Sequence, residues 1–163
     1  MSAVIFTSYY LCPLGTIELK ATAEHIISVL FVDRIEIENP NELTKLATIQ
    51  LDEYFDKKRT QFDLPLQQEG TEFQLKIWEA LTKIPFGRTL SYKDLALKTG
   101  KVGSVRAVGA ANGQNQILLV IPCHRVIAAD GNLTGYAGEL WRKEWLLNFE
   151  QGDKNGKQMG LVY

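Results

Sequence analysis

The chain has 163 residues, of which 45% are apolar and 23% are charged. This length can bury one substantial core or two small ones, which excludes a large multidomain machine. No apolar run approaches the ~18 residues that cross a bilayer, and the first residues lack the basic start of an export signal. We therefore expect a cytoplasmic protein rather than a membrane or secreted one.

The charges are unevenly distributed along the chain. Residues 1–69 carry a net charge of −5 and residues 70–150 a net charge of +3, within an overall net charge of −1. The basic excess is concentrated between Lys76 and Arg106. Polyanion binding by the second part requires such a bias, but an excess this small is equally compatible with a solvated surface.

The first 69 residues predict a small α/β lobe. Alternating apolar residues predict strands within 4–11 and 16–22, and a β-branched apolar run predicts a third strand over 26–32. Asn41 is the predicted N-cap of a helix whose apolar stripe ends near Phe55.

The remaining features of this lobe suggest no chemistry. Residues 62–66 alternate again, as in a further strand. Cys12 has no acid or base nearby in sequence and is interpreted as structural, and His25 as a surface histidine. The composition then changes at 67–70, which predicts a linker.

Three short helices are predicted after the linker. The first has a capping box that starts at Thr71, and Pro85 ends its apolar pattern. Ser91 opens a second helix that ends at Gly100, and a third begins near Ser104. Short helices joined by glycine-containing turns are typical of a helix-turn-helix unit.

The third predicted helix is almost free of bulky side chains. Arg106 is its only long residue, and Gly109 in its middle costs about 1 kcal/mol relative to alanine. We expect another surface to approach this backbone closely. A narrow DNA minor groove fits better than a major groove, which needs several long polar side chains. Packing against a second helix is the alternative.

Cys123 follows an apolar run over 117–121 and precedes His124 and Arg125. Free cysteines are most often small buried hydrophobes. With an ordinary pKa of roughly 8.5, a nucleophilic cysteine needs a nearby base or positive charge. In an extended segment Cys123 and His124 would point to opposite faces, so a bridging water or a local turn would have to connect them.

The sequence contains no motif for a nucleotide cofactor or a metal ion. The glycines form neither of the common phosphate-binding fingerprints, and the cysteines and histidines lack zinc spacing. We therefore expect no cofactor and no metal.

A final helix is predicted over 142–150, and the polar residues 151–163 are expected to form a frayed tail.

Three motifs now carry a family resemblance. The segments Arg-Ala-Val-Gly-Ala-Ala-Asn-Gly-Gln-Asn at 106–115, Ile-Pro-Cys-His-Arg-Val at 121–126 and Leu-Thr-Gly-Tyr-Ala-Gly at 133–138 resemble the O6-alkylguanine-DNA alkyltransferases. The resemblance implies an α/β plus α fold. A ribonuclease-H-like domain over 1–69 would precede a winged helix-turn-helix-like domain over 70–150, which binds the minor groove and flips the damaged nucleotide.

The resemblance also implies a chemistry. Cys123 would take the alkyl group of O6-methylguanine, with O4-methylthymine as a further candidate, in a stoichiometric reaction that ends in a stable thioether. His124 would act as base through a water molecule, and Glu150 would orient it. From sequence alone, Glu150 could instead be a surface residue. The implied partner is double-stranded DNA containing O6-alkylguanine, bound by a monomer away from any membrane.

The same resemblance assigns five further residues to DNA and base binding. Arg106 would replace the extruded base in the stack, where a planar guanidinium stacks better than an ammonium. Tyr92 would help to rotate the nucleotide and donate a hydrogen bond to it. Carbonyls at Cys123 and Val126 would accept from the exocyclic amine, Asn115 would hold the turn between recognition helix and active-site strand, and Ala137 would contact O6 through its backbone N–H.

Three departures from the family pattern stand out. Gln116 occupies a common proline position, which predicts a less rigid turn. Glu139 replaces a small residue and could slow association with DNA. Zinc ligands of some members have no counterpart here. Two other functions remain: a lesion-binding module without catalysis, which the presence of Cys123 disfavours, and a cysteine hydrolase, which the opposed side chains of Cys123 and His124 disfavour.

Overall fold

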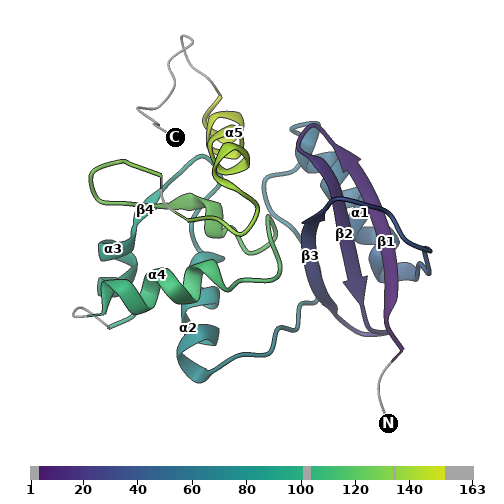
Figure 1. Ribbon diagram of the computed structural model, residues 1–163, viewed down its shortest axis with the longest axis horizontal. Coiled ribbons are helices and arrows are strands. Elements are labelled where there is room, and N and C mark those ends of the chain that lie inside the picture. Colours follow the sequence, from purple (N-terminus) through teal and green to yellow (C-terminus); the bar gives the residue numbers. More distant parts are fainter. Residues whose placement is uncertain (1–3, 101–103, 134, 153–163) are drawn as a thin grey trace. The chain divides into compact units, whose positions relative to one another are not determined.

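The structure is a computed structural model that describes residues 4–100, 104–133 and 135–152. The chain divides into two compact units, Met1–Glu69 and Gly70–Tyr163 (Figure 1). Within the described residues, no helix is both long enough and apolar enough to cross a membrane. Most of the predicted tail, together with Thr134 of the third motif, lies outside the described residues.

The N-terminal unit is a three-stranded antiparallel sheet with one helix. Strands β1 (Phe6–Cys12), β2 (Gly15–Ala21) and β3 (Ile26–Val32) pair in sequence order. Helix α1 (Glu42–Phe55) packs against β1 and β2, as Figure 1 shows. The predicted strands and helix are present within one or two residues of their expected limits, because apolar alternation and an N-cap are local signals.

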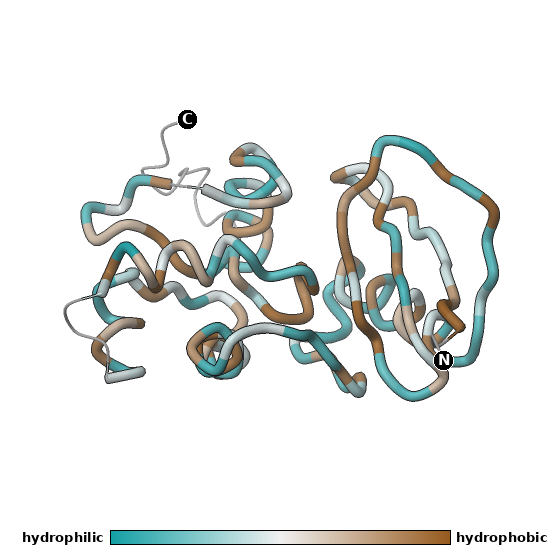
Figure 2. Tube along the Cα trace, turned by 60° about the horizontal axis from the view of Figure 1, so that its bottom comes forward, coloured by the Kyte–Doolittle hydropathy of each residue, from teal (hydrophilic) through white to brown (hydrophobic). Residues whose placement is uncertain are grey.

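The core of this unit lies between the sheet and α1. Ile17, Leu19 and Ala21 point inward from β2 and are buried, as are Leu51 and Tyr54 on α1. Asn41 forms the predicted cap: its side chain accepts from Thr44 N at 2.9 Å. This unit therefore folds around an ordinary hydrophobic core, and apolar and hydrophilic segments alternate along the coloured part of the tube in Figure 2.

The predicted strand over 62–66 is wrong. Its apolar residues are half-buried and alternate with exposed ones, but only Leu66 makes a β-bridge, with Ile26. Ile26 N donates to the Pro65 carbonyl at 2.8 Å, and Gln67 N donates to the Ile26 carbonyl at 3.0 Å. Pro65 has no N–H to extend a ladder, so alternating burial persists without a strand.

The C-terminal unit is mainly helical. Its elements are α2 (Glu72–Leu81), β4 (Leu90–Ser91), α3 (Tyr92–Lys98), α4 (Val105–Gly113), the 3₁₀ helix η1 (Cys123–Arg125), β5 (Val126–Ile127) and α5 (Leu140–Gln151). Helix α4 packs on α2 and α3, which gives the predicted helix-turn-helix arrangement (Figure 1). The Trp78 indole N–H donates to the Ala111 carbonyl at 2.9 Å and ties α4 to α2.

The active-site strand that the resemblance implied is absent, because the chain is compact both before the cysteine and at it. Residues 117–121 form no strand: Ile121 N donates to the Ile117 carbonyl at 3.1 Å, and Leu119 has a φ of 71°. The segment is therefore a compact buried turn. A short apolar run does not distinguish a buried strand from a buried turn, because its periodicity is the same. Residues 123–125 are likewise not extended, since they form η1.

Candidate active site

Cys123 is the first residue of η1 and is 2% exposed. Successive residues of a 3₁₀ helix are rotated by about 120°, against about 180° in a strand. The expectation that Cys123 and His124 point to opposite faces is therefore wrong, and the local turn that the sequence left open is present. The main argument against a joint role for these two side chains disappears.

His124 and Arg125 both bind the carboxylate of Glu150. His124 Nε2 lies 2.8 Å from Glu150 Oε2. Arg125 donates through Nε to Glu150 Oε1 at 2.8 Å and through a terminal nitrogen to Oε2 at 2.9 Å. Glu150 is 6% exposed, so it is not a surface residue. Planar guanidinium and carboxylate groups match in this two-point geometry, which holds the carboxylate rigidly.

The environment of Glu150 keeps it ionised. Burial alone would raise the pKa of this carboxyl, but the adjacent His124 and the hydrogen bonds and charge of Arg125 outweigh burial and hold its pKa well below its ordinary value. An ionised carboxylate only accepts hydrogen bonds, so Nε2 of His124 carries the proton in the assigned tautomer. Nδ1 of a neutral ring is then an acceptor.

His124 Nδ1 is buried and has no hydrogen-bond partner within the described residues. Buried polar atoms are nearly always paired, so an unpaired acceptor on an oriented imidazole requires an explanation. A water molecule, or a proton donor in the reacting complex, satisfies it. The arrangement can therefore accept a proton at Nδ1 while Glu150 stabilises the resulting positive charge.

Unlike Glu150, which is kept ionised, the Cys123 thiol is kept protonated by its surroundings. Burial raises its pKa to about 11, although a hydrogen bond from the Asn115 side chain and the positive charge of Lys143 act in the opposite direction. The free protein therefore holds Cys123 as a protonated thiol. Formation of the thiolate requires a base to take the proton, which is what the unpaired Nδ1 offers.

Lys143 is a functional candidate that the sequence analysis missed. It belongs to a buried stripe of α5, with the spacing i, i+3, i+4, i+7: Lys143, Leu146, Leu147 and Glu150. Burial lowers the pKa of Lys143 to about 8, while the nearby Cys123 raises it. A lysine at a core position of an amphipathic helix was the available signal, since lysine is rarely buried without a reason.

Tyr92 connects the site to the helix-turn-helix. The Lys143 ammonium lies 5.8 Å from the centroid of the Tyr92 ring. On the other side, a Cβ added to Gly109 of α4 would lie 3.7 Å from two ring carbons of Tyr92. That is an ordinary contact, so no close approach inside the protein demands glycine there. Helix α4 instead exposes other small residues, Ala107, Ala110 and Gly113, together with Arg106.

The other predicted binding residues occupy different environments. Asn115 is buried, and its amide donates to the Ile121 carbonyl at 2.9 Å and accepts from Ile117 N at 3.0 Å. It therefore holds a turn, not the start of a strand. Val126 is buried in β5, and Ala137 is exposed in the loop before α5.

The Cys123 carbonyl is already occupied in this structure. It accepts from the Asn112 side chain at 3.3 Å and from the backbone N–H of Val126. A carbonyl has two lone pairs, so a third donor would have to displace one of these two. The implied contact of this carbonyl with an exocyclic amine is therefore not available without a rearrangement.

The described residues contain no candidate metal site. Nowhere among them do three or more histidine, cysteine, aspartate or glutamate side chains come together so that they could hold a metal ion. Cys12 lies in β1, half-buried, and His25 immediately precedes β3. Tyr136 is the remaining buried polar neighbour: its ring packs edge-on against His124 with centroids 6.4 Å apart.

A helix-turn-helix unit and a thiol, imidazole and carboxylate site in one domain define a class of DNA-binding proteins with a reactive cysteine. Residues 72–152 match the family model described as 6-O-methylguanine DNA methyltransferase, DNA binding domain, and residues 5–68 match its ribonuclease-like domain. The chain belongs to the methylated-DNA–protein-cysteine methyltransferase family. The resemblance and the fold class stated from the sequence are thereby confirmed.

Individual relatives agree with this assignment. The chain is 44% identical to the methylated-DNA–protein-cysteine methyltransferase of Methanosarcina barkeri, over 86% of this chain and 94% of that one. The crystal structure of the Mycobacterium tuberculosis O6-methylguanine methyltransferase has a TM-score of 0.84 at 35% identity, covering 94% of this chain and 97% of that one. A complex of the M. tuberculosis protein with DNA has a TM-score of 0.82 at 38% identity, covering 91% and 92%.

Proposed function

We propose that this protein repairs DNA by moving the alkyl group of O6-alkylguanine onto the sulfur of Cys123. The observation that carries the proposal is the buried cluster in which Glu150 orients His124, the residue next to Cys123. Glu150 Oε2 lies 2.8 Å from His124 Nε2. The membership in the methylated-DNA–protein-cysteine methyltransferase family supplies the substrate class. O4-methylthymine is a further candidate substrate.

The reaction follows from the protonation states of the site. His124 Nδ1 takes the thiol proton of Cys123 through a water molecule, and the ionised Glu150 stabilises the imidazolium. The thiolate attacks the alkyl carbon in line with the C–O6 bond. A carbon–sulfur bond forms, the electron pair of the broken bond moves to the purine, and a proton returns to it so that neutral guanine leaves.

The product limits each molecule to one reaction. A thioether is stable, and the site holds no group that cleaves it, so the protein acts stoichiometrically. Lys143 assists the first step, because its positive charge lowers the pKa of the Cys123 thiol against the effect of burial. It acts through the electrostatics of Cys123 and needs no contact with DNA.

The remaining predicted residues are assigned to base extrusion and recognition. Arg106 stands exposed on α4, where its guanidinium can fill the space left by the flipped nucleotide. Tyr92 contacts the flipped base and donates to it. Asn115 holds the turn before the cysteine, Val126 accepts from the base through its carbonyl, and Ala137 approaches O6 through its N–H. A monomer acting on DNA in the cytoplasm is sufficient for this reaction.

A duplex carrying one O6-methylguanine tests the proposal. Mass spectrometry of the protein after incubation should find one added methyl group on the peptide with Cys123, and none in Cys123→Ser. The half-buried Cys12 provides the matched control, since Cys12→Ser should still accept the methyl group.

Two outcomes would overturn the proposal. Methyl transfer to Cys12, or several demethylated bases per protein molecule, contradicts a single acceptor at Cys123. Tight binding of methylated DNA without loss of the methyl group would instead support the alternative, a lesion-binding module without catalysis.

A further inference from the structure

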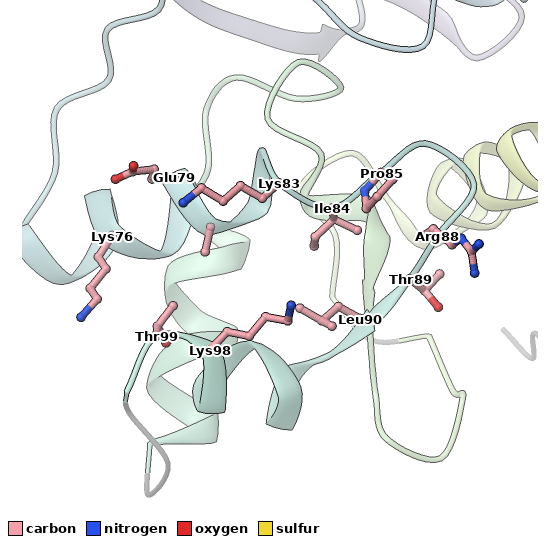
Figure 3. A pocket seen from close by; sticks show the side chains of 11 residues that line it. Lys76, Glu79, Lys83, Ile84, Pro85, Arg88, Thr89, Leu90, Lys98 and Thr99 are labelled. Carbon is pink, nitrogen blue, oxygen red and sulfur yellow. The ribbon is translucent and has the colours of Figure 1, made fainter.

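A cavity in the C-terminal unit lies apart from the cysteine site. It has a volume of about 320 Å³ and is bounded by α2, the end of α3 and the loop from α2 to β4 (Figure 3). Its lining contains four basic side chains and a single carboxylate: Lys76, Lys83, Arg88, Lys98 and Glu79. Neither the cysteine cluster nor α4 contributes to this lining.

The four basic side chains are unpaired within the described part of the chain, where none of them takes part in an ion pair. Lys98 lies in the last turn of α3, where a cation offsets the partial charge of the helix end. Lys76 lies within α2 and Arg88 in a loop, so the helix ends do not account for these two. The excess positive charge of the four side chains faces solvent.

The cavity faces away from the recognition helix. Four lining residues on α2 and in the turn that follows it have the spacing i, i+3, i+4, i+7 of one stripe: Lys76, Glu79, Ala80 and Lys83. The buried residues of α2, Ile77, Trp78 and Leu81, form the opposite stripe, and Trp78 is bonded to α4. A duplex held by the exposed face of α4 therefore leaves the cavity uncovered.

We propose that this cavity binds a backbone phosphate of a second DNA segment while α4 holds the first. Lysine ammonium groups bind phosphate as compact point charges, and Arg88 adds a further positive charge beside the cavity. Figure 3 shows Lys98 extending from the end of α3 toward Leu90 and Ile84. Ile84 and Leu90 give the cavity an apolar wall, which suits the carbon face of a deoxyribose next to the phosphate.

A second DNA contact has a consequence for the search for damage. One molecule that holds two segments can pass directly from one to the other without dissociating into solution. This role goes beyond alkyl transfer, and it concerns a surface that the proposed repair site does not use. Non-specific contacts of this kind have dissociation constants of about 10⁻⁴ to 10⁻⁶ M at physiological salt and are tighter at low salt.

Analytical ultracentrifugation of the full chain with an excess of short undamaged duplex at low salt tests the proposal. The pocket variant is Lys76→Glu with Lys83→Glu. The matched control is Lys45→Glu with Lys58→Glu, which changes the net charge equally at exposed lysines of the other unit. We expect two duplexes per protein for the natural sequence and the control, and at least a ~10-fold weaker second duplex for the pocket variant.

Several results would overturn the proposal. These are a single duplex per molecule of the natural protein, an unchanged second duplex in the pocket variant, an equal loss in the control, and two-duplex complexes that always contain two protein molecules. Methyl transfer to Cys123 is measured in parallel on the same variants. Its absence would refute the repair function and leave the duplex count interpretable.

Discussion

His124 Nε2 and Glu150 Oε2 lie 2.8 Å apart, although 26 positions separate the two residues in the chain. The contact joins η1 to α5, and Arg125 completes it by binding both oxygens of the same carboxylate. Arg125 also donates to the Ile84 carbonyl at 2.7 Å. The orientation of the base next to Cys123 therefore depends on three segments that meet only in the folded domain.

Replacing Glu150 by glutamine should destabilise the protein in a pH-dependent way. The folded state holds the pKa of Glu150 below its ordinary value of 4.5, so the stabilisation is fully present above that pH and is lost as the pH falls further. At pH 7 we expect Glu150→Gln to cost about 3 kcal/mol, the usual effect of breaking a buried ion pair. Urea unfolding at several pH values measures this, and the difference from the natural protein should shrink below pH 4.5. A pH-independent difference would contradict the assignment.

Replacing Lys143 by methionine should impair thiolate formation at Cys123. Loss of the positive charge removes an effect that lowers the pKa of the thiol, and each unit of pKa reduces the thiolate fraction about tenfold. The rate of benzyl transfer from free O6-benzylguanine against pH measures this. The natural protein should show an inflection near pH 8, where Lys143 loses its charge, and Lys143→Met should not. Lys93→Met, at an exposed position, is the control, and identical profiles for all three proteins would refute this role.

Replacing Arg106 by alanine should slow repair of duplex DNA but not the reaction with the free base. The guanidinium compensates for unstacking the flipped nucleotide, which costs a few kcal/mol, so we expect a loss of about 10-fold or more on duplex substrate only. Single-turnover rates on methylated duplex and on free O6-benzylguanine compare the two. Val105→Ala removes a neighbouring exposed side chain of the same helix and should change neither rate. Equal slowing on both substrates would show that Arg106 acts in the chemical step.

Replacing Glu139 by glycine should stabilise the protein. Glu139 has φ 77° and ψ 147°, a region that is nearly restricted to glycine and that costs other residues about 1 to 3 kcal/mol. The substitution loses the ion pair between the exposed Glu139 carboxylate and Arg142, and an ion pair with an exposed partner is worth at most about 1 kcal/mol. Thermal unfolding should show a higher midpoint for Glu139→Gly. Glu139→Ala, which loses the ion pair and keeps the strain, should show none of this gain, and a lower midpoint for Glu139→Gly would refute the explanation.

Local signals in the sequence accounted for much of the fold. The capping residues Asn41, Thr71 and Ser91 accept the predicted backbone hydrogen bonds, because a cap involves residues only three positions apart. The alternation at 62–66 wrongly predicted a strand, and the apolar run at 117–121 did not predict the buried turn, since neither run specifies its hydrogen-bond partners.

The sequence by itself determined the family, the two-lobed organisation that the family implies and the identity of the candidate nucleophile, because these are carried by contiguous motifs. Only the tertiary structure decided that Glu150 binds both His124 and Arg125, that Lys143 lies buried near Cys123, and that unpaired lysines of α2 and α3 share a cavity. Each of these facts depends on contacts between distant segments. Burial and partial charge at such contacts are properties of the packed domain, and no stretch of sequence encodes them locally.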